Sequence, residues 1–489
     1  MIEKTRLRRA LRAASMGGAA LGLTAILAAC ASGPASDAAS AAANIQAAWT
    51  EIGSGNQLLA RVVTSYAPAS EREPVCPYLV VDDTAQRMTL RVAAGEVAQR
   101  PTTSDPAESK PSAFPVSVCE APIPSSAQSA VLAGRALPLA KAEPRRIAVI
   151  GDSGCRMEKS KNAWQACNDV NAWPFAKIAA AAAAMNPDLV LHVGDYAYRE
   201  NACPPNEAGC QGSPWGYGWD VWQADLFTPA APLLAKAPWI VARGNHEECA
   251  RSGQGWFRFL DTRPYAARLS CDTASNDSAG NHADPYAVAL GAGTQMIVFD
   301  SSKAGNKALR PADPRFAAYA EEFRAVAALA AKPGISTTIF VSHHPVLAFD
   351  PVAGRAPAPG SPALQSVLQA VNGPTYYPPG VTLALHGHVH GFQAISFASN
   401  HPATIVTGNA GDKLDAALPD PLPAQAAPAP GAVIDRITHH ANFGFMMMER
   451  PPGATAWTFK VYTATAQLLA TCKQNGSKLS CDKTGMLAP

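Results

Sequence analysis

The sequence predicts an α/β protein in which a layered α/β domain follows a small β-sandwich. Residues 47–143 contain short β-like runs separated by Pro- and Ser-rich turns, with no convincing helix. From residue 144 onward, strand-like and helix-like runs alternate, which is typical of layered α/β domains. The chain has 489 residues and is 48% hydrophobic, so it can bury the core of one large and one small domain.

Residues 1–30 have the parts of a lipoprotein signal peptide. A basic segment precedes a short apolar stretch, which ends in the lipobox-like sequence LAAC. We expect lipid attachment at Cys30, with an ordinary signal peptide cut nearby as the alternative. The protein is therefore expected to be exported, as a periplasmic or cell-surface lipoprotein. Ala31 follows Cys30, and by resemblance to bacterial lipoproteins this residue favours the outer membrane. Residues 31–46 are small and polar, as expected of a flexible tether.

The cysteine count predicts disulfides. The chain has 11 cysteines, so an even number remains once Cys30 is set apart. Nearest neighbours in the sequence are the simplest pairing: Cys76–Cys119, Cys155–Cys167, Cys203–Cys210, Cys249–Cys271 and Cys472–Cys481. A thiolate metal site would instead need closely spaced Cys-x-x-Cys pairs, which the sequence lacks.

The region 144–489 divides into alternating elements. Strands are expected within 145–154, 189–193, 239–244, 336–343, 381–388 and 455–465. Helices are expected at 173–185, 226–236 and 315–331, and hairpins at 286–302 and 472–481. The Pro-rich stretches 351–363 and 416–432 are expected to be surface loops.

The charge balance excludes some functions. Forty basic and 38 acidic residues give a net charge of +2, so we expect no nucleic-acid-binding patch. No second long apolar run follows Cys30, which gives no support for a membrane-spanning role beyond the expected lipid anchor. The oligomeric state does not follow from the sequence.

Polar residues that can bind metal follow the predicted strands. In chain order they are Asp152, Asp195 with Tyr198, Asn245 with His246, His343 with His344, and His386, His388 and His390. Active sites of α/β sheets lie at the carboxyl ends of strands, so these five clusters predict one convergent metal site. His388 and His390 are two apart on an extended segment and therefore face the same side.

The motif series D-x-G, GD-x-x-Y, GNH-E/D, H-x-P and GH-x-H resembles the calcineurin-like metallophosphoesterase superfamily. The tyrosine in GD-x-x-Y is similar to the purple acid phosphatases, and the resemblance covers roughly residues 145–450. It implies a four-layer α/β/β/α metallophosphoesterase sandwich over 144–489, preceded by a small β-sandwich over 47–143.

The resemblance also implies a role for each motif residue. The first metal would be bound by Asp152, Tyr198 and His390, the second by Asn245, His343 and His388, with Asp195 bridging both. Pro345 lies two residues after His343, which favours His343 over His344 as the ligand. His246 would contact the phosphoryl group or help to protonate the leaving group. Other nearby residues would line the pocket, contact phosphate or be structural: His192, His386, His439, His440, Arg199 and Arg243.

Tyr198 determines the expected metals. A phenol has a reference pKa of about 10, so binding it as an anion in mild acid requires a strongly Lewis-acidic ion. Fe(III) fits, with Fe, Zn or Mn as the divalent partner. Gly154 stands where many members of the superfamily have a histidine, and Tyr198 would replace that ligand. The alternative is that Tyr198 is an aromatic lid over a di-Zn or di-Mn site.

These features predict a phosphoric ester hydrolase that cleaves small phosphomonoesters with a metal-bridging hydroxide. One alternative is a phosphodiesterase or nucleotide hydrolase on the same metal core, because loops choose the substrate. Another is a surface binding protein whose metal site is structural, which would require a closed site with no open position.

Overall fold

A computed structural model of the protein describes residues 44–67, 75–104 and 106–488. The expected signal peptide, Cys30 and most of the expected tether lie outside these residues. Strand β1 (Ile45–Ile52) begins one residue before the expected end of the tether at residue 46. No helix in the described part of the chain combines the length and apolarity needed to cross a membrane.

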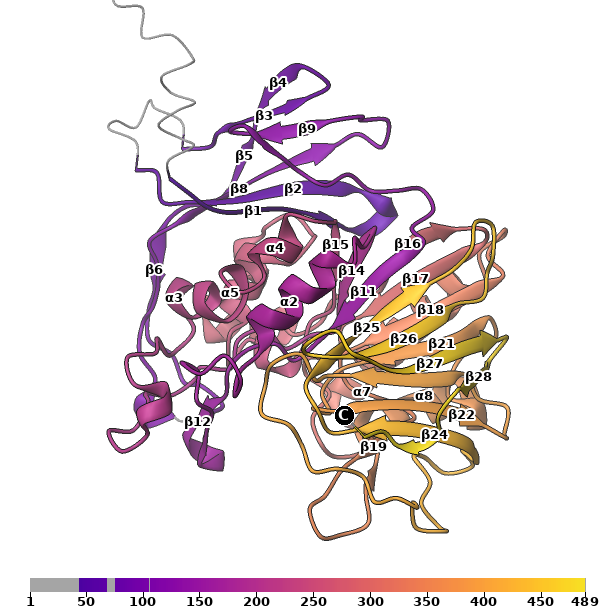
Figure 1. Cartoon of the computed structure of the whole chain (residues 1–489). Coiled ribbons are helices and arrows are strands. Elements are labelled where there is room, and N and C mark those ends of the chain that lie inside the picture. The colour runs from indigo at the N-terminus through magenta and orange to yellow at the C-terminus, as the bar shows by residue number, and fades with distance from the viewer. Residues whose placement is uncertain (1–43, 68–74, 105, 489) are drawn as a thin grey trace, which may run out of the picture.

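Two large sheets dominate the described residues and lie face to face (Figure 1). The eleven-stranded sheet runs in the order β28 (Lys478–Cys481), β27 (Leu468–Asn475), β26 (Thr458–Thr463), β25 (Gly444–Glu449), β11 (Arg146–Ile150), β14 (Leu189–His192), β15 (Trp239–Val241), β1, β2 (Leu58–Thr64), β8 (Ser117–Ile123) and β5 (Thr89–Val92). The eight-stranded sheet runs in the order β16 (Tyr286–Gly291), β17 (Thr294–Phe299), β18 (Thr337–Ser342), β21 (Val381–His386), β23 (Ala403–Thr407), β22 (Phe392–Phe397), β24 (Ile434–His440) and β29 (Gly485–Met486).

Helices cover the outer faces of both sheets, which gives the α/β/β/α layering. On the larger sheet these are α2 (Phe175–Ala184), α3 (Trp219–Trp222), α4 (Ala231–Leu234) and α5 (Gly253–Phe259). On the smaller sheet they are α7 (Pro314–Ala330) and α8 (Pro362–Asn372). A short helix, α6 (Asp277–Gly280), lies in the loop before β16.

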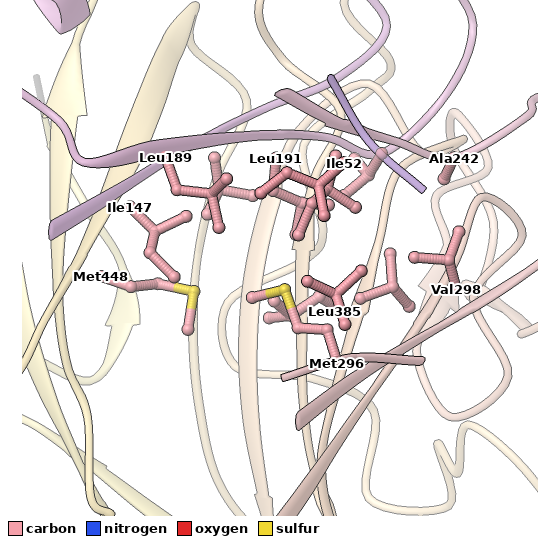
Figure 2. Close-up of a cluster of buried hydrophobic side chains, with 14 of the residues drawn as sticks. Ile52, Ile147, Leu189, Leu191, Ala242, Met296, Val298, Leu385 and Met448 are labelled. Atoms are coloured by element: carbon pink, nitrogen blue, oxygen red, sulfur yellow. The ribbon is translucent and has the colours of Figure 1, made fainter. Parts of the chain in front are cut away.

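The main core lies between the sheets. Figure 2 shows Ile147, Leu189 and Leu191 of the larger sheet facing Met296 and Leu385 of the smaller one. These strands are apolar on both faces because helices cover the other side of each sheet. The packed sheets fix the relative positions of the ends of the strands. The polar residues that follow these strands are therefore also fixed relative to one another.

The N-terminal strands extend the larger sheet. A four-stranded sheet of β10 (Arg135–Ala136), β9 (Ala130–Leu132), β3 (Tyr78–Val81) and β4 (Thr84–Arg87) packs over β1, β2, β5 and β8, as in a sandwich. However, β1 pairs in parallel with β15, through Glu51 and Trp239. Backbone hydrogen bonds of the larger sheet therefore join residues on both sides of the domain boundary expected at residue 143.

Three smaller two-stranded ribbons complete the strands. They are β6 (Gly95–Val97) with β7 (Ser112–Phe114), β12 (Met157–Glu158) with β13 (Ala163–Trp164), and β19 (Phe349–Asp350) with β20 (Ala358–Pro359). The described residues form five disulfides, and each joins cysteines that are nearest neighbours in the sequence.

Two expected elements differ from the structure. The single helix expected at 226–236 is instead a π-helical turn at Gln223–Phe227 followed by α4. Pro229 and Pro232 explain the break, because proline lacks an N–H donor and is tolerated only in the first turn of a helix. The loop expected at 351–363 ends early, since Ser361 caps α8 by accepting a hydrogen bond from the Leu364 N–H.

Candidate metal centre

The carboxyl ends of five parallel strands bring the motif residues to one edge of the sheet stack. Asp152, Asp195 and Asn245 follow β11, β14 and β15, which pair in parallel within the larger sheet. His343 and His388 follow β18 and β21 of the facing sheet, which are also parallel. The loops of both sheets therefore meet at this edge.

Unusual backbone geometry holds these side chains close together. Asp152, Asp195 and His388 have φ angles of 55°, 60° and 70°, in the left-handed region. Such residues cost about 1–3 kcal/mol each and cluster at functional sites. A Cβ on Gly244 would lie 2.0 Å from Asp195 Oδ1, so only glycine allows this approach.

A first ligand group surrounds the Tyr198 hydroxyl. The hydroxyl oxygen lies 3.0 Å from Asp152 Oδ1, 2.8 Å from Asp195 Oδ2 and 3.2 Å from His390 Nε2. His390 Nδ1 lies 2.9 Å from the Lys413 carbonyl oxygen, so in the neutral ring Nδ1 donates there and Nε2 keeps its lone pair. One phenolic hydrogen cannot satisfy three acceptors, and a cation among these atoms would.

A second ligand group surrounds Asn245 Oδ1. This oxygen lies 3.1 Å from His343 Nε2 and 2.9 Å from His388 Nδ1. His343 Nε2 is also 3.0 Å from Asp195 Oδ2, while its Nδ1 is 3.0 Å from the Val193 carbonyl oxygen. A neutral His343 ring would therefore direct a lone pair at two acceptor oxygens, so this position needs positive charge, supplied by a proton or by a metal ion.

Asp195 joins the two groups. Its Oδ2 contacts both Tyr198 and His343, and ligand atoms of Asp195, His343 and His388 all lie within 4.8 Å of one another. The donor set of imidazole nitrogens together with carboxylate, amide and phenol oxygens suits iron, zinc or manganese. The site residues thus fit a pair of metal ions, with one carboxylate between them.

The electrostatics of the site favour positive charge. Although burial alone would lower it, the Asp195 and Asp152 carboxylates raise the pKa of His343 to about 9. Burial alone would lower the pKa of His390, but Asp412 and Asp415 raise it to about 10. Burial and the neighbouring carboxylates Asp152 and Asp195 raise the pKa of Tyr198 well above its ordinary value, so the phenol ionises only if a metal ion compensates.

His246 lies against the first ligand group without belonging to it. Its ring packs on the Tyr198 ring with centroids 3.8 Å apart, and its backbone N–H donates to Asp195 Oδ1 at 2.8 Å. Its Nδ1 is 2.6 Å from Glu200 Oε1, and its Nε2 is 4.0 Å from Asp195 Oδ2. Burial and Arg251 lower the pKa of His246, while Asp195 and Glu200 act in the opposite direction.

Several functional residues were missed by sequence reasoning. Arg156 lies over the Tyr198 ring, 4.9 Å from its centroid, and Arg156 Nε contacts both oxygens of Asp412 at 3.1 Å. Glu247 accepts backbone N–H bonds from Asp195 and Tyr196 at 3.1 and 2.8 Å, which fixes the GD-x-x-Y turn. Glu247 is the last residue of the GNHE motif, so the motif itself could have indicated it. No local sequence pattern indicates Arg156 or Asp412.

Other residues considered from the sequence lie outside the two ligand groups. His192 contacts Ser153 and His386 contacts Ser342, both at 3.0 Å. His344 is 3.1 Å from Ser301 Oγ, and His343 rather than His344 lies in the second group. The remaining four are His439 and His440 in β24, Arg199 paired with Asp225, and Arg243 paired with Asp300.

Open space adjoins the second ligand group. A cavity of about 420 Å³ is lined by Asn245, His246, His388 and His390, together with Arg156. Asn245 and His388 are partly exposed, whereas Asp152, Asp195 and Tyr198 are buried. A ligand can therefore reach the site from the side of the second group, which disfavours a closed structural metal site.

Comparisons with known proteins agree with this geometry. The model of the calcineurin-like phosphoesterase family matches residues 145–392. Purple acid phosphatase PPD1 from yellow lupin (Lupinus luteus) seeds has a similar fold, with a TM-score of 0.51 and 13% identity, covering 87% of this chain and 73% of that one. PhoD is similar with a TM-score of 0.51 and 10% identity, covering 91% of this chain and 92% of that one. No curated protein sequence matches the chain.

Proposed function

Because the chain belongs to the calcineurin-like phosphoesterase family and is a metal-dependent phosphoester hydrolase, we propose that it is a binuclear phosphatase of small phosphomonoesters. The observation that carries this proposal is the pair of ligand groups that share Asp195 Oδ2. Seven side chains from five strand ends form these groups, and an open cavity adjoins them.

In this proposal the residues divide into the roles expected from the motifs. Asp152, Tyr198 and His390 hold one ion, Asn245, His343 and His388 hold the other, and Asp195 lies between them. When bound, such a pair lowers the pKa of a shared water and neutralises charge on the phosphoryl oxygens. The partly exposed Asn245 and His388 leave the approach to this pair open for the ester.

We propose Fe(III) at the Tyr198 position, with divalent Fe, Zn or Mn as its partner. Support comes from the position of the hydroxyl oxygen, which lies within 3.2 Å of Asp152 Oδ1, Asp195 Oδ2 and His390 Nε2. Burial and the carboxylates Asp152, Asp195 and Asp412 raise the pKa of the phenol, so only a strongly Lewis-acidic ion would hold it as an anion. Arg156, over the ring, acts in the opposite direction and would help to stabilise a tyrosinate.

His246 is the proposed hydrogen-bond donor to the phosphoryl or leaving-group oxygen. Glu200 holds Nδ1 of the ring, which leaves Nε2 on the side of Asp195. Arg251 Nε donates to Glu200 Oε1 at 2.8 Å and Tyr217 donates to Glu200 Oε2 at 3.2 Å, so the carboxylate is held on both sides. His246 can therefore move or hold a proton at Nε2 without changing its orientation.

The test compares hydrolysis of 4-nitrophenyl phosphate and bis(4-nitrophenyl) phosphate by the purified protein. The proposal predicts faster turnover of the monoester. Faster turnover of the diester would instead support a phosphodiesterase on the same metal core, and turnover of neither would contradict both.

We also propose that the protein is exported and anchored to a membrane through lipid on Cys30. The basic and apolar segments before LAAC support this, as do the five disulfides, which persist in oxidising compartments. Cys30→Ser should move the protein from the membrane fraction to the soluble fraction. Unchanged membrane association of this variant would contradict the anchor.

A further inference from the structure

We propose that a second cavity beside the metal centre binds a second phosphoryl group, so that the preferred substrates carry two or more phosphoryl groups. This inference rests on the proposed phosphatase function, and it specifies the substrate class for the same site. Three observations carry it: the position of the cavity, the charge of its walls, and a buried hydroxyl group with no partner.

The cavity continues directly from the metal centre. It has a volume of about 440 Å³, within the range of small-molecule sites. Lys161, Asn245, Asn306 and His388 line both this cavity and the one over the ligand groups. A substrate whose scissile phosphate lies at Asn245 and His388 can therefore extend into this space.

The walls of this cavity are mainly basic. Its charged lining residues are Lys161, Arg251, Lys303, Lys307, Arg315 and Glu248. Glu248 is paired with Lys303, and acids outside the lining pair with Lys161, Arg251 and Arg315. Among the described residues, Lys307 has no carboxylate within ion-pair distance. The charge of Lys307 is therefore not compensated by a paired carboxylate, which favours an anionic occupant.

Ser302 provides the independent indication of a ligand. Ser302 is one of the residues that line the cavity, and it is only 2% exposed. Its Oγ has no hydrogen-bond partner among the described residues, although buried hydroxyl groups normally have one. A phosphoryl oxygen entering the cavity would accept a hydrogen bond from this hydroxyl group.

The cavity over the ligand groups does not offer the same environment. Besides Arg156, Lys161 and Lys413, its charged lining includes Asp350 and Asp415 as well as the expected ligand Asp195. These carboxylates disfavour a second phosphate there, whereas the cavity lined by Lys307 favours one. The charge distribution therefore determines the direction in which a multiply phosphorylated substrate lies.

The test uses the purified full-length protein and two matched substrates, phenyl phosphate and 1,4-phenylene bisphosphate. We expect kcat/KM to be about tenfold higher for the bisphosphate than for phenyl phosphate. The bisphosphate has two equivalent esters, which alone would raise kcat/KM about twofold. The larger factor corresponds to one charge-assisted contact. The preference should fall as salt is raised, because exposed charges are screened.

Variants assign the preference to the cavity. Lys307→Glu should reduce the ratio of the two kcat/KM values about tenfold, and Ser302→Ala should reduce it about threefold. Lys332→Gln is the matched control and should leave the ratio unchanged, because Lys332 is an exposed lysine just after the end of α7 and does not line the cavity.

The outcomes separate this inference from the proposed function. If the protein cleaves phenyl phosphate but shows no preference above the statistical factor, the second subsite is refuted and the phosphatase stands. A preference that is the same in Lys307→Glu and Ser302→Ala also refutes the subsite. If neither ester is cleaved, the phosphatase proposal itself fails.

Discussion

Replacing Asp195 by asparagine tests whether one carboxylate serves both ions. Asp195→Asn keeps the size of the side chain but removes the charge that lies 2.8 Å from the Tyr198 hydroxyl and 3.0 Å from His343 Nε2. In the proposed centre this carboxylate contacts both ions, and each charge-assisted contact contributes about 1.5–3 kcal/mol. Losing two gives about 3–6 kcal/mol, which corresponds to a fall of about 10²–10⁴-fold in kcat/KM.

The assay measures kcat/KM on phenyl phosphate and metal content per chain after gel filtration. Bound metal should fall from about two ions per chain to one or none. Asp435→Asn, in an exposed part of β24, is the matched control and should change neither quantity. Far-UV circular dichroism should show that both variants fold. If Asp195→Asn keeps two ions and full activity, the shared-carboxylate reasoning is wrong.

Three further predictions follow from the surroundings of the site. His246→Ala should lower kcat about 100-fold for an ester with a poor leaving group but much less for 4-nitrophenyl phosphate, because only the poor leaving group needs a proton. Steady-state kinetics on both esters measure this difference, and equal losses of kcat would contradict the role. Arg156→Met leaves Asp412 buried without its guanidinium partner and should lower the free energy of unfolding in urea by about 3–5 kcal/mol, whereas an unchanged value would refute the structural importance of this pair. Removing metal with a chelator should lower Tm, and adding iron with zinc should restore it, because the ions bind only the folded state; an unchanged Tm would contradict this.

The fold and the convergence of the expected ligand residues were largely predictable because their signals are local. Each expected ligand lies within six residues of the end of an apolar strand, and the carboxyl ends of parallel strands converge. A short motif such as GDYAY therefore indicates both position and chemistry. Family membership and the similar folds of solved structures confirm the expected superfamily.

What the sequence did not reveal depends on contacts between distant segments. The pairing of β1 with β15 joins residues about 190 positions apart, and no local pattern encodes it. Arg156 and Asp412 likewise meet across 256 positions. Helix α8 was missed because its prolines and glycines upstream resembled a continuous loop, although Pro362 is well suited to a first helical turn.

Visible absorption together with metal content tests the central claim most directly. The purified protein, prepared without chelators, should contain about two metal ions per chain, one of them iron. It should show a charge-transfer band that disappears in Tyr198→Phe, because the phenolate would bind the ferric ion. A colourless protein with two zinc or manganese ions would contradict the iron–tyrosinate account and leave Tyr198 as an aromatic lid. A protein that binds no metal would contradict the binuclear centre itself.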